Sequence, residues 1–147
     1  MRRVYVVVQA LLVAALVAQF YLAAVGAFDR PHTDDSFAWH SENGMLVIPA
    51  LILLATLAAA LARAPGRLIA LTIAPLGLLV VQVLIIVLGN AVAGGDQDPT
   101  GPAALAILGL HAVNGMLMIG AAATVLRRAR SLPARTDRVD RAPTPVA

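Results

Sequence analysis

Four long apolar runs, separated by short polar segments, limit what this chain can fold into. They cover about residues 4–28, 38–62, 68–93 and 103–126. An α-helix needs about 20 mostly apolar residues to cross the hydrocarbon core of a bilayer, and each run reaches that length. Because 60% of the 147 residues are hydrophobic and only 13% are charged, a soluble globular domain is excluded. The runs predict an all-α, four-helix transmembrane bundle.

The first run has features of a secretory signal peptide as well as those of a membrane span. Arg2 and Arg3 precede it, and small residues lie near Gly26. The apolar stretch of a signal peptide is about 7–15 residues long, however, and this one continues from Val4 past residue 20. We therefore predict a span that is retained.

The positions of the arginines predict the orientation of the spans. All eleven basic residues are Arg, and all but Arg30 lie before the first run, between the second and third runs, or after the fourth. The two remaining connections carry acidic residues, namely Asp29, Asp34, Asp35, Glu42, Asp96 and Asp98. Because basic residues favour the cytoplasmic side, both termini are expected in the cytoplasm. The basic tail has no interleaved aromatic residues, so we expect no nucleic-acid partner.

The chain divides into a membrane domain at residues 1–130 and a tail at residues 131–147. The tail mixes Pro, Arg and Asp without periodicity, so we predict that it is disordered in the cytoplasm. No residue is Cys, which excludes disulfides, iron–sulfur clusters and covalently attached haem. No Gly-rich phosphate loop is present, so nothing indicates a nucleotide-binding enzyme.

One nine-residue motif occurs twice. The segment from His40 to Ile48 reads HSENGMLVI, and the segment from His111 to Ile119 reads HAVNGMLMI, identical at six of nine positions. In each copy His, Asn and Gly stand at i, i+3 and i+4, which is one face of a helix. An imidazole with bare backbone one turn away can bind a metal while a flat macrocycle lies against the helix.

A second internal match indicates a repeat. Gln19 precedes Gly26 by seven residues, and Gln82 precedes Gly89 by seven, each late in a span that runs outward. Together with the His motifs, this predicts two tandem helical hairpins, at about residues 1–63 and 64–130. Parallel repeats of this kind are related by an axis along the membrane normal, and ligands commonly lie between them.

The depths of the two histidines do not match when they are measured from the nearest inner arginine. His111 is 16 residues from Arg127, or about 24 Å along a helix, whereas His40 is 23 residues from Arg63, or about 34 Å. His40 is therefore expected one to two turns higher. Pro49, inside the second span, predicts a bend that would change the depth of His40 and the direction in which its side chain points.

These motifs predict a haem site. His40 and His111 would be the metal ligands, Gly44 and Gly115 would admit the macrocycle, and four amides would orient the imidazoles or contact propionates. These amides are Asn43, Asn114, Gln19 and Gln82. The main alternative is a non-enzymatic scaffold or accessory subunit whose polar residues hydrogen-bond between helices. A quinone, another metal or another ligand is the third interpretation.

The arrangement of four spans, with an outer-side His on the second and fourth, resembles one half of the haem A synthase family and, more loosely, bis-His b-type cytochromes. Residues 3–128 also resemble short four-span bacterial integral membrane proteins of unknown function. The first resemblance implies haem b between His40 and His111 near the outer face. The synthase's loop cysteines are absent, and Phe37 stands where it has Glu, so haem binding is what we carry over. We expect a bacterial inner-membrane protein that exchanges electrons with a quinone or a partner protein, and leave oligomerisation open.

Overall fold

The structure, a computed structural model, describes residues 1–94 and 101–132. Its helices are α1 (Arg2–Phe28), α2 (Ala38–Glu42), the π-helical segment η1 (Asn43–Val47), α3 (Ile48–Leu61), α4 (Gly66–Val92) and α5 (Pro102–Arg130). The segments α2, η1 and α3 form one continuous span of 24 residues, and this span, α1, α4 and α5 are each long and apolar enough to cross a membrane. The prediction of an all-α protein with four membrane-spanning helices is confirmed.

The helix bounds differ from the predicted runs mainly at the end of α5. This helix continues to Arg130, although the apolar run was expected to end at about residue 126. Most of the expected second outer loop, and the expected disordered tail from residue 133 onward, lie outside the described residues.

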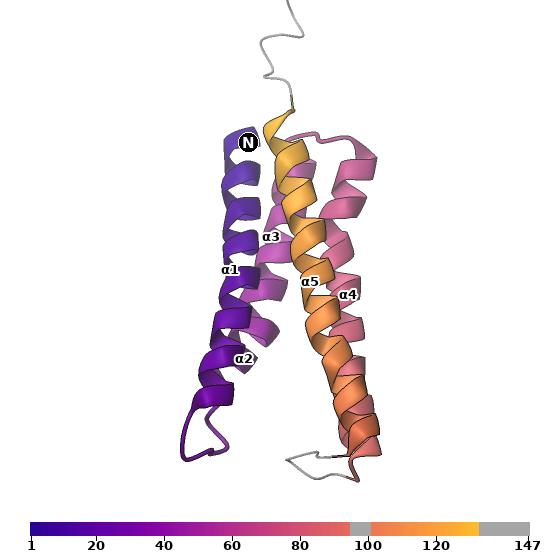
Figure 1. Cartoon of the computed structure of the whole chain (residues 1–147). Coiled ribbons are helices and arrows are strands. Elements are labelled where there is room, and N and C mark those ends of the chain that lie inside the picture. The colour runs from indigo at the N-terminus through magenta and orange to yellow at the C-terminus, as the bar shows by residue number, and fades with distance from the viewer. Residues whose placement is uncertain (95–100, 133–147) are drawn as a thin grey trace, which may run out of the picture.

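The four spans form two antiparallel hairpins, one built from α1 with α2–α3 and the other from α4 with α5 (Figure 1). The hairpins meet at the end that carries the N-terminus and diverge toward the other end (Figure 1). Both hairpins contribute to the buried cluster at the meeting end, which consists of Tyr5, Ala58, Ala59, Ala64, Leu68, Val125 and Ala129. This cluster joins the hairpins at that end, and a second buried cluster that includes Leu12, Ile52 and Ala122 joins them further along the bundle.

Two buried polar contacts cross between the hairpins near this cluster. The hydroxyl groups of Tyr5 and Thr72 are 2.7 Å apart, and Gln9 donates a hydrogen bond from Nε2 to the carbonyl oxygen of Ala122 at 3.0 Å. Since polar groups inside a membrane bundle need partners, these bonds join α1 to both helices of the second hairpin.

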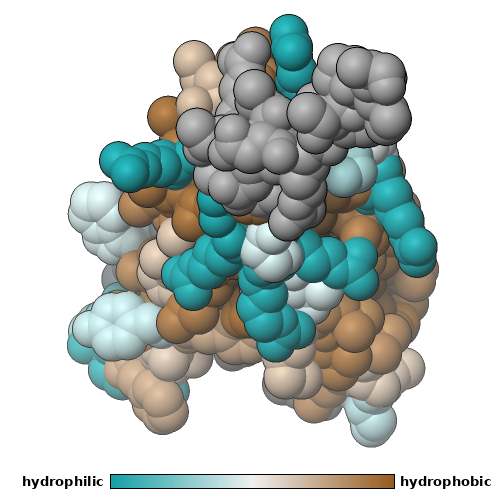
Figure 2. Space-filling view, turned by 90° about the horizontal axis from the view of Figure 1, so that it is seen from above, coloured by the Kyte–Doolittle hydropathy of each residue, from teal (hydrophilic) through white to brown (hydrophobic). Residues whose placement is uncertain are grey.

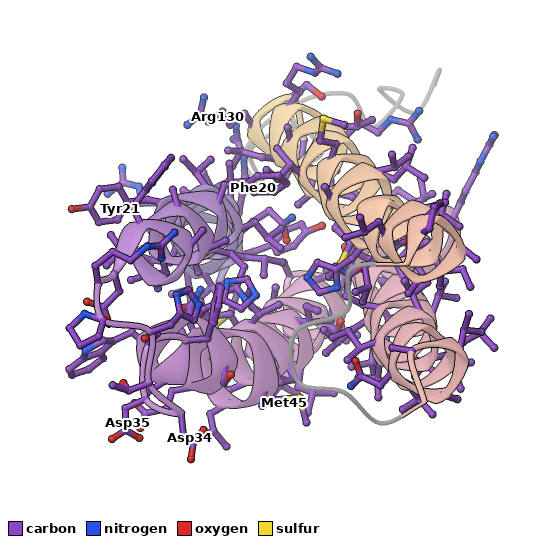
Figure 3. The ribbon with its side chains drawn as sticks, turned by 60° about the horizontal axis from the view of Figure 1, so that its bottom comes forward. Phe20, Tyr21, Asp34, Asp35, Met45 and Arg130 are labelled. Carbon is purple, nitrogen blue, oxygen red and sulfur yellow. The ribbon has the colours of Figure 1, made fainter. Side chains whose placement is uncertain are left out.

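The described charges separate along the bundle. Hydrophilic side chains gather at the end where the N-terminus lies, while the flanks are hydrophobic (Figure 2). At the opposite end lie Asp34 and Asp35, whereas Arg130 lies at the first end (Figure 3). We call the first end the arginine end, because it carries Arg2, Arg3, Arg63, Arg67, Arg127, Arg128 and Arg130.

Candidate ligand site between the two hairpins

An amide network joins the two helices of the first hairpin. Asn43 donates from Nδ2 to the carbonyl oxygen of Ala15 at 3.0 Å and to Oε1 of Gln19 at 2.6 Å. Gln19 in turn donates from Nε2 to the carbonyl oxygen of His40 at 2.9 Å. These bonds set the height of the second span against α1.

The second hairpin repeats this network with the equivalent residues. Asn114 donates from Nδ2 to the carbonyl oxygen of Leu78 at 2.8 Å and to Oε1 of Gln82. Gln82 donates from Nε2 to the carbonyl oxygen of His111 at 2.8 Å. The equivalent residues are 63 positions apart in the first helix of each hairpin and 71 apart in the second. The structure therefore contains the internal repeat that the two motifs predicted.

The glycines of the second sequence match have a packing role. A Cβ atom at Gly26 would stand 2.6 Å from Cδ1 of Phe37, and one at Gly89 would stand 2.7 Å from Cδ2 of Leu108. Phe37 and Leu108 are again 71 residues apart. Both glycines let the two helices of a hairpin approach closely just outside the amide network.

The segment η1 marks a one-residue difference between the repeats. Before it, equivalent residues are 71 apart. After it, the buried residues of α3 and α5 match at a separation of 70, as in the pairs Ile48–Met118, Ile52–Ala122, Ala55–Val125 and Ala59–Ala129. The N–H of Ile48 bonds to the carbonyl oxygen of Asn43, five residues earlier. A π-helical turn holds one residue more than an α-helical turn, so η1 absorbs an extra residue directly before Pro49.

The two histidines of the motif face the same space. The ring centroids of His40 and His111 are 6.0 Å apart, and the ring planes are inclined by 44°. Both side chains are half-buried. The two rings therefore differ in height by at most 6.0 Å, less than the difference of about 10 Å between the two helix-rise values.

The expected height difference was too large because Arg127 does not mark the same level of the bundle as Arg63. Arg127 lies inside α5, and Ala129, two residues further on, packs in the same buried cluster as Ala59 and Ala64. The two arginines therefore differ in depth, so helix rise measured from them overstates the height difference between the two histidines.

Hydrogen bonding determines which nitrogen of His40 carries the proton. Nδ1 of His40 lies 3.1 Å from the carbonyl oxygen of Gln19, which can only accept, so Nδ1–H is the donor. Nε2 then bears a lone pair, which accepts from Nε2 of Gln19 at 3.2 Å. In this tautomer Nε2 carries the lone pair that could bind a metal, which would replace the hydrogen bond from Gln19, and a backbone carbonyl on the other nitrogen is the usual support of a metal-binding His.

His111 differs from His40 in its partners. Its Nδ1 atom is buried and has no hydrogen-bond partner among the described residues. His40 bonds through Nδ1 to the carbonyl oxygen of Gln19. The equivalent acceptor in the second hairpin is the carbonyl oxygen of Gln82. A buried polar nitrogen without a partner costs about 1–3 kcal/mol, so the imidazole of His111 is available for a further interaction.

A cavity of about 300 Å³ lies between the hairpins at this level. It is partly open, and its volume lies at the lower end of the roughly 300–1,000 Å³ of small-molecule sites. Six repeat-related pairs contribute to its wall, namely Leu16–Leu79, Gln19–Gln82, Phe20–Val83, His40–His111, Gly44–Gly115 and Ile48–Met118. Both hairpins therefore supply the same elements to one shared cavity.

Side chains of this protein lie against the two glycines of the cavity. A Cβ atom at Gly44 would stand 2.8 Å from Nε2 of Gln19, and one at Gly115 would stand 3.1 Å from Cζ of Phe20. Phe20 lies on the side of α1 toward α5, whereas Tyr21 points away from the bundle (Figure 3). Sequence reasoning missed Phe20, because its contact with Gly115 joins two different hairpins and no local pattern encodes it.

The remaining site residues of the prediction have supporting positions. Asn43 and Asn114 do not line the cavity, and their amide nitrogens are fully engaged within the hairpins. In the part of the chain that the structure describes, no three or more His, Asp or Glu side chains come together. A metal held by His40 and His111 would therefore draw its other ligands from outside the chain, as an iron porphyrin does.

These features define a four-helix membrane protein with a two-histidine cavity between internal repeats. The model of a family of unknown function (DUF6220) matches residues 19–90. That segment begins at Gln19 and includes His40 and Gln82, but it ends before His111. The match agrees with the expected likeness to membrane proteins of unknown function, and the likeness to haem A synthase stays a prediction. No curated protein and no solved structure matches this chain.

Proposed function

We propose that this chain is an integral membrane haem protein that holds one haem b between His40 and His111 and transfers electrons. The observation that carries the proposal is the distance of 6.0 Å between the two ring centroids. Two imidazoles on opposite sides of one metal, each with its nitrogen about 2.0–2.1 Å away, have centroids roughly 6 Å apart.

The hydrogen bonds of the two histidines support the proposal. The Nδ1–H of His40 is held by the carbonyl oxygen of Gln19, which leaves Nε2 free of a proton. Nδ1 of His111 is buried without a partner in the described structure. A metal would use the lone pair on Nε2 of His40, and His111 has an imidazole that no hydrogen bond in the described structure already engages at Nδ1.

Each part of the cavity has a defined task in this proposal. The imidazoles of His40 and His111 would hold the iron, Gln19 and Gln82 would fix the helices that carry them through their bonds to the His40 and His111 carbonyl oxygens, and the apolar side chains of the wall would contact the macrocycle. Haem held by two histidines would supply electron transfer. The cavity is partly open, which gives a quinone or a partner protein a route to the haem edge.

The arrangement of charges supports an orientation for the same proposal. The arginine end would face the cytoplasm, because basic residues favour that side of the membrane. The haem would then lie in the outer half of a bacterial inner membrane, and electrons would be exchanged on that side.

A second candidate is an accessory membrane protein whose polar residues only hold the bundle together. The amide networks favour it, because Gln19 with Asn43 and Gln82 with Asn114 already link helices without any ligand. Interhelical bonds of this kind contribute about 0.6 kcal/mol each on average. In this case His40 and His111 would serve only to pack the helices together.

An absorption spectrum distinguishes the two candidates. The full chain is expressed with haem supplied, purified in detergent, and measured reduced against oxidised. His40→Ala, His111→Ala and His32→Ala are compared, since His32 lies in the exposed loop between α1 and α2 and serves as the matched control. We expect a low-spin haem spectrum in the unaltered protein and in His32→Ala, and its loss in the other two.

The opposite results would overturn the haem proposal. Absence of haem from every sample would do so, as would an unchanged spectrum in both His40→Ala and His111→Ala. Lower thermal stability of these variants, without any spectral consequence, would favour the accessory protein instead.

A further inference from the structure

A second cavity, of about 400 Å³, lies at the arginine end between α1 and α5. Its walls are Arg2, Arg3, Val6, Val7 and Arg130. It shares no residue with the cavity between the histidines, so the proposed haem function makes no use of it.

The polar side of this cavity is held in place by a contact between the two helices. Arg2 donates from Nη2 to the carbonyl oxygen of Arg130 at 2.6 Å. The last carbonyl groups of a helix lack helical partners and carry partial negative charge, so this bond ties the start of α1 to the end of α5. A guanidinium has five N–H donors, and the bond uses one of them.

The cavity concentrates positive charge that nothing nearby in the described structure neutralises. The described acidic residues, Asp29, Asp34, Asp35 and Glu42, all lie in or next to the loop between α1 and α2, at the opposite end. Three guanidinium groups around one cavity therefore favour an anion. Arginine pairs especially well with phosphate, because its planar fork can donate two parallel hydrogen bonds.

The other side of the cavity is apolar and continues onto the surface of a spanning helix. Val6 is half-buried and Val7 is exposed, on the first two turns of α1. A free inorganic anion would make no favourable contact with these two valine side chains. A ligand with a phosphate and a hydrocarbon chain would contact both sides.

We propose that this cavity binds one anionic phospholipid. The guanidinium groups of Arg2, Arg3 and Arg130 hold its phosphate, and Val6 and Val7 contact the start of an acyl chain. Basic pockets between spanning helices on the cytoplasmic side bind anionic headgroups in this way. The bound lipid bridges α1 and α5 where the two hairpins meet.

The test is a lipid titration followed by native mass spectrometry. The full chain in detergent is titrated with phosphatidylglycerol or with phosphatidylcholine of the same acyl chains. We expect at least about fivefold higher occupancy by phosphatidylglycerol, the effect of roughly one arginine near a charged headgroup. Equal occupancy would overturn the proposal, and so would complete displacement of the lipid by millimolar inorganic phosphate.

Two double variants locate the binding. Arg3→Gln with Arg130→Gln removes two guanidiniums of the cavity and keeps the bond from Arg2 to the Arg130 carbonyl. Arg67→Gln with Arg127→Gln removes the same charge from the same end outside the cavity. The first should lower phosphatidylglycerol occupancy about tenfold or more, and the second less than about twofold. An equal loss in both would mean a general charge effect and would overturn the proposal; the titration of the unaltered protein decides the question even if a variant fails to fold.

Discussion

The ring of Phe20 lies against the bare backbone of Gly115, with Cζ 3.1 Å from the position that a Cβ atom would take. The contact joins α1 of one hairpin to α5 of the other, on the wall of the cavity between the histidines. A larger residue at Gly115 must therefore displace the ring of Phe20, which is part of the cavity wall.

The first prediction follows from this contact. Gly115→Val should lower stability by about 1–3 kcal/mol through overpacking and should reduce the haem content of the purified protein. Thermal unfolding and the haem spectrum measure the two effects. Gly120→Val is the matched control, because Gly120 lies on the same helix with nothing within 4 Å of its added Cβ; equal losses in both variants would contradict the prediction.

The second prediction concerns the bond between Asn114 and Gln82. In a double-mutant cycle, Asn114→Ala and Gln82→Ala should show a coupling energy of about 0.5–1.5 kcal/mol, because each removes the same interhelical hydrogen bond. Denaturant-induced unfolding of the single and double variants gives this energy. Asn90→Ala with Gln82→Ala should be additive within about 0.5 kcal/mol, since Asn90 is exposed and lies two turns away on α4. Coupling as large in the control pair would count against the network.

The third prediction concerns the bond between the hairpins at the arginine end. Tyr5→Phe removes the hydroxyl that lies 2.7 Å from that of Thr72. The loss should be about 0.5–1.5 kcal/mol, because Thr72 keeps its second bond, to the carbonyl oxygen of Leu68. Tyr21→Phe, which alters an exposed hydroxyl, should not change the unfolding temperature. A drop of similar size there would show that the Tyr5 effect does not come from this contact.

The fourth prediction concerns the π-helical segment η1. Deleting Leu46 should leave the protein folded, because the segment can become α-helical without turning Ile48 and Ile52 away from the core. Deleting Leu54, also exposed, should unfold the bundle, because it rotates the rest of α3 by about 100°. Circular dichroism and thermal unfolding of both variants test this. A folded Leu54 variant, or an unfolded Leu46 variant, would be the contrary result.

Much of the architecture follows from the order of the residues. The apolar runs predict four spans because bilayer thickness sets the length of a helix that crosses it. The repeated His-x-x-Asn-Gly motif, with Gln19 and Gln82, predicts two equivalent hairpins, since equal local sequence forms equal local contacts. The structure bears this out in the paired hydrogen bonds of Asn43 and Asn114.

Three features of the site depend on how the hairpins pack and were not predictable from the chain. The close approach of His40 and His111 was obscured because Arg127 lies inside α5 rather than at its boundary. The contact of Phe20 with Gly115 joins residues of different hairpins, and no local pattern encodes it. The extra residue in η1 became visible only when the buried positions of α3 and α5 were matched. Length and periodicity are properties of one helix, whereas depth, register and cavity shape come from side chains of separate helices that fill a common space.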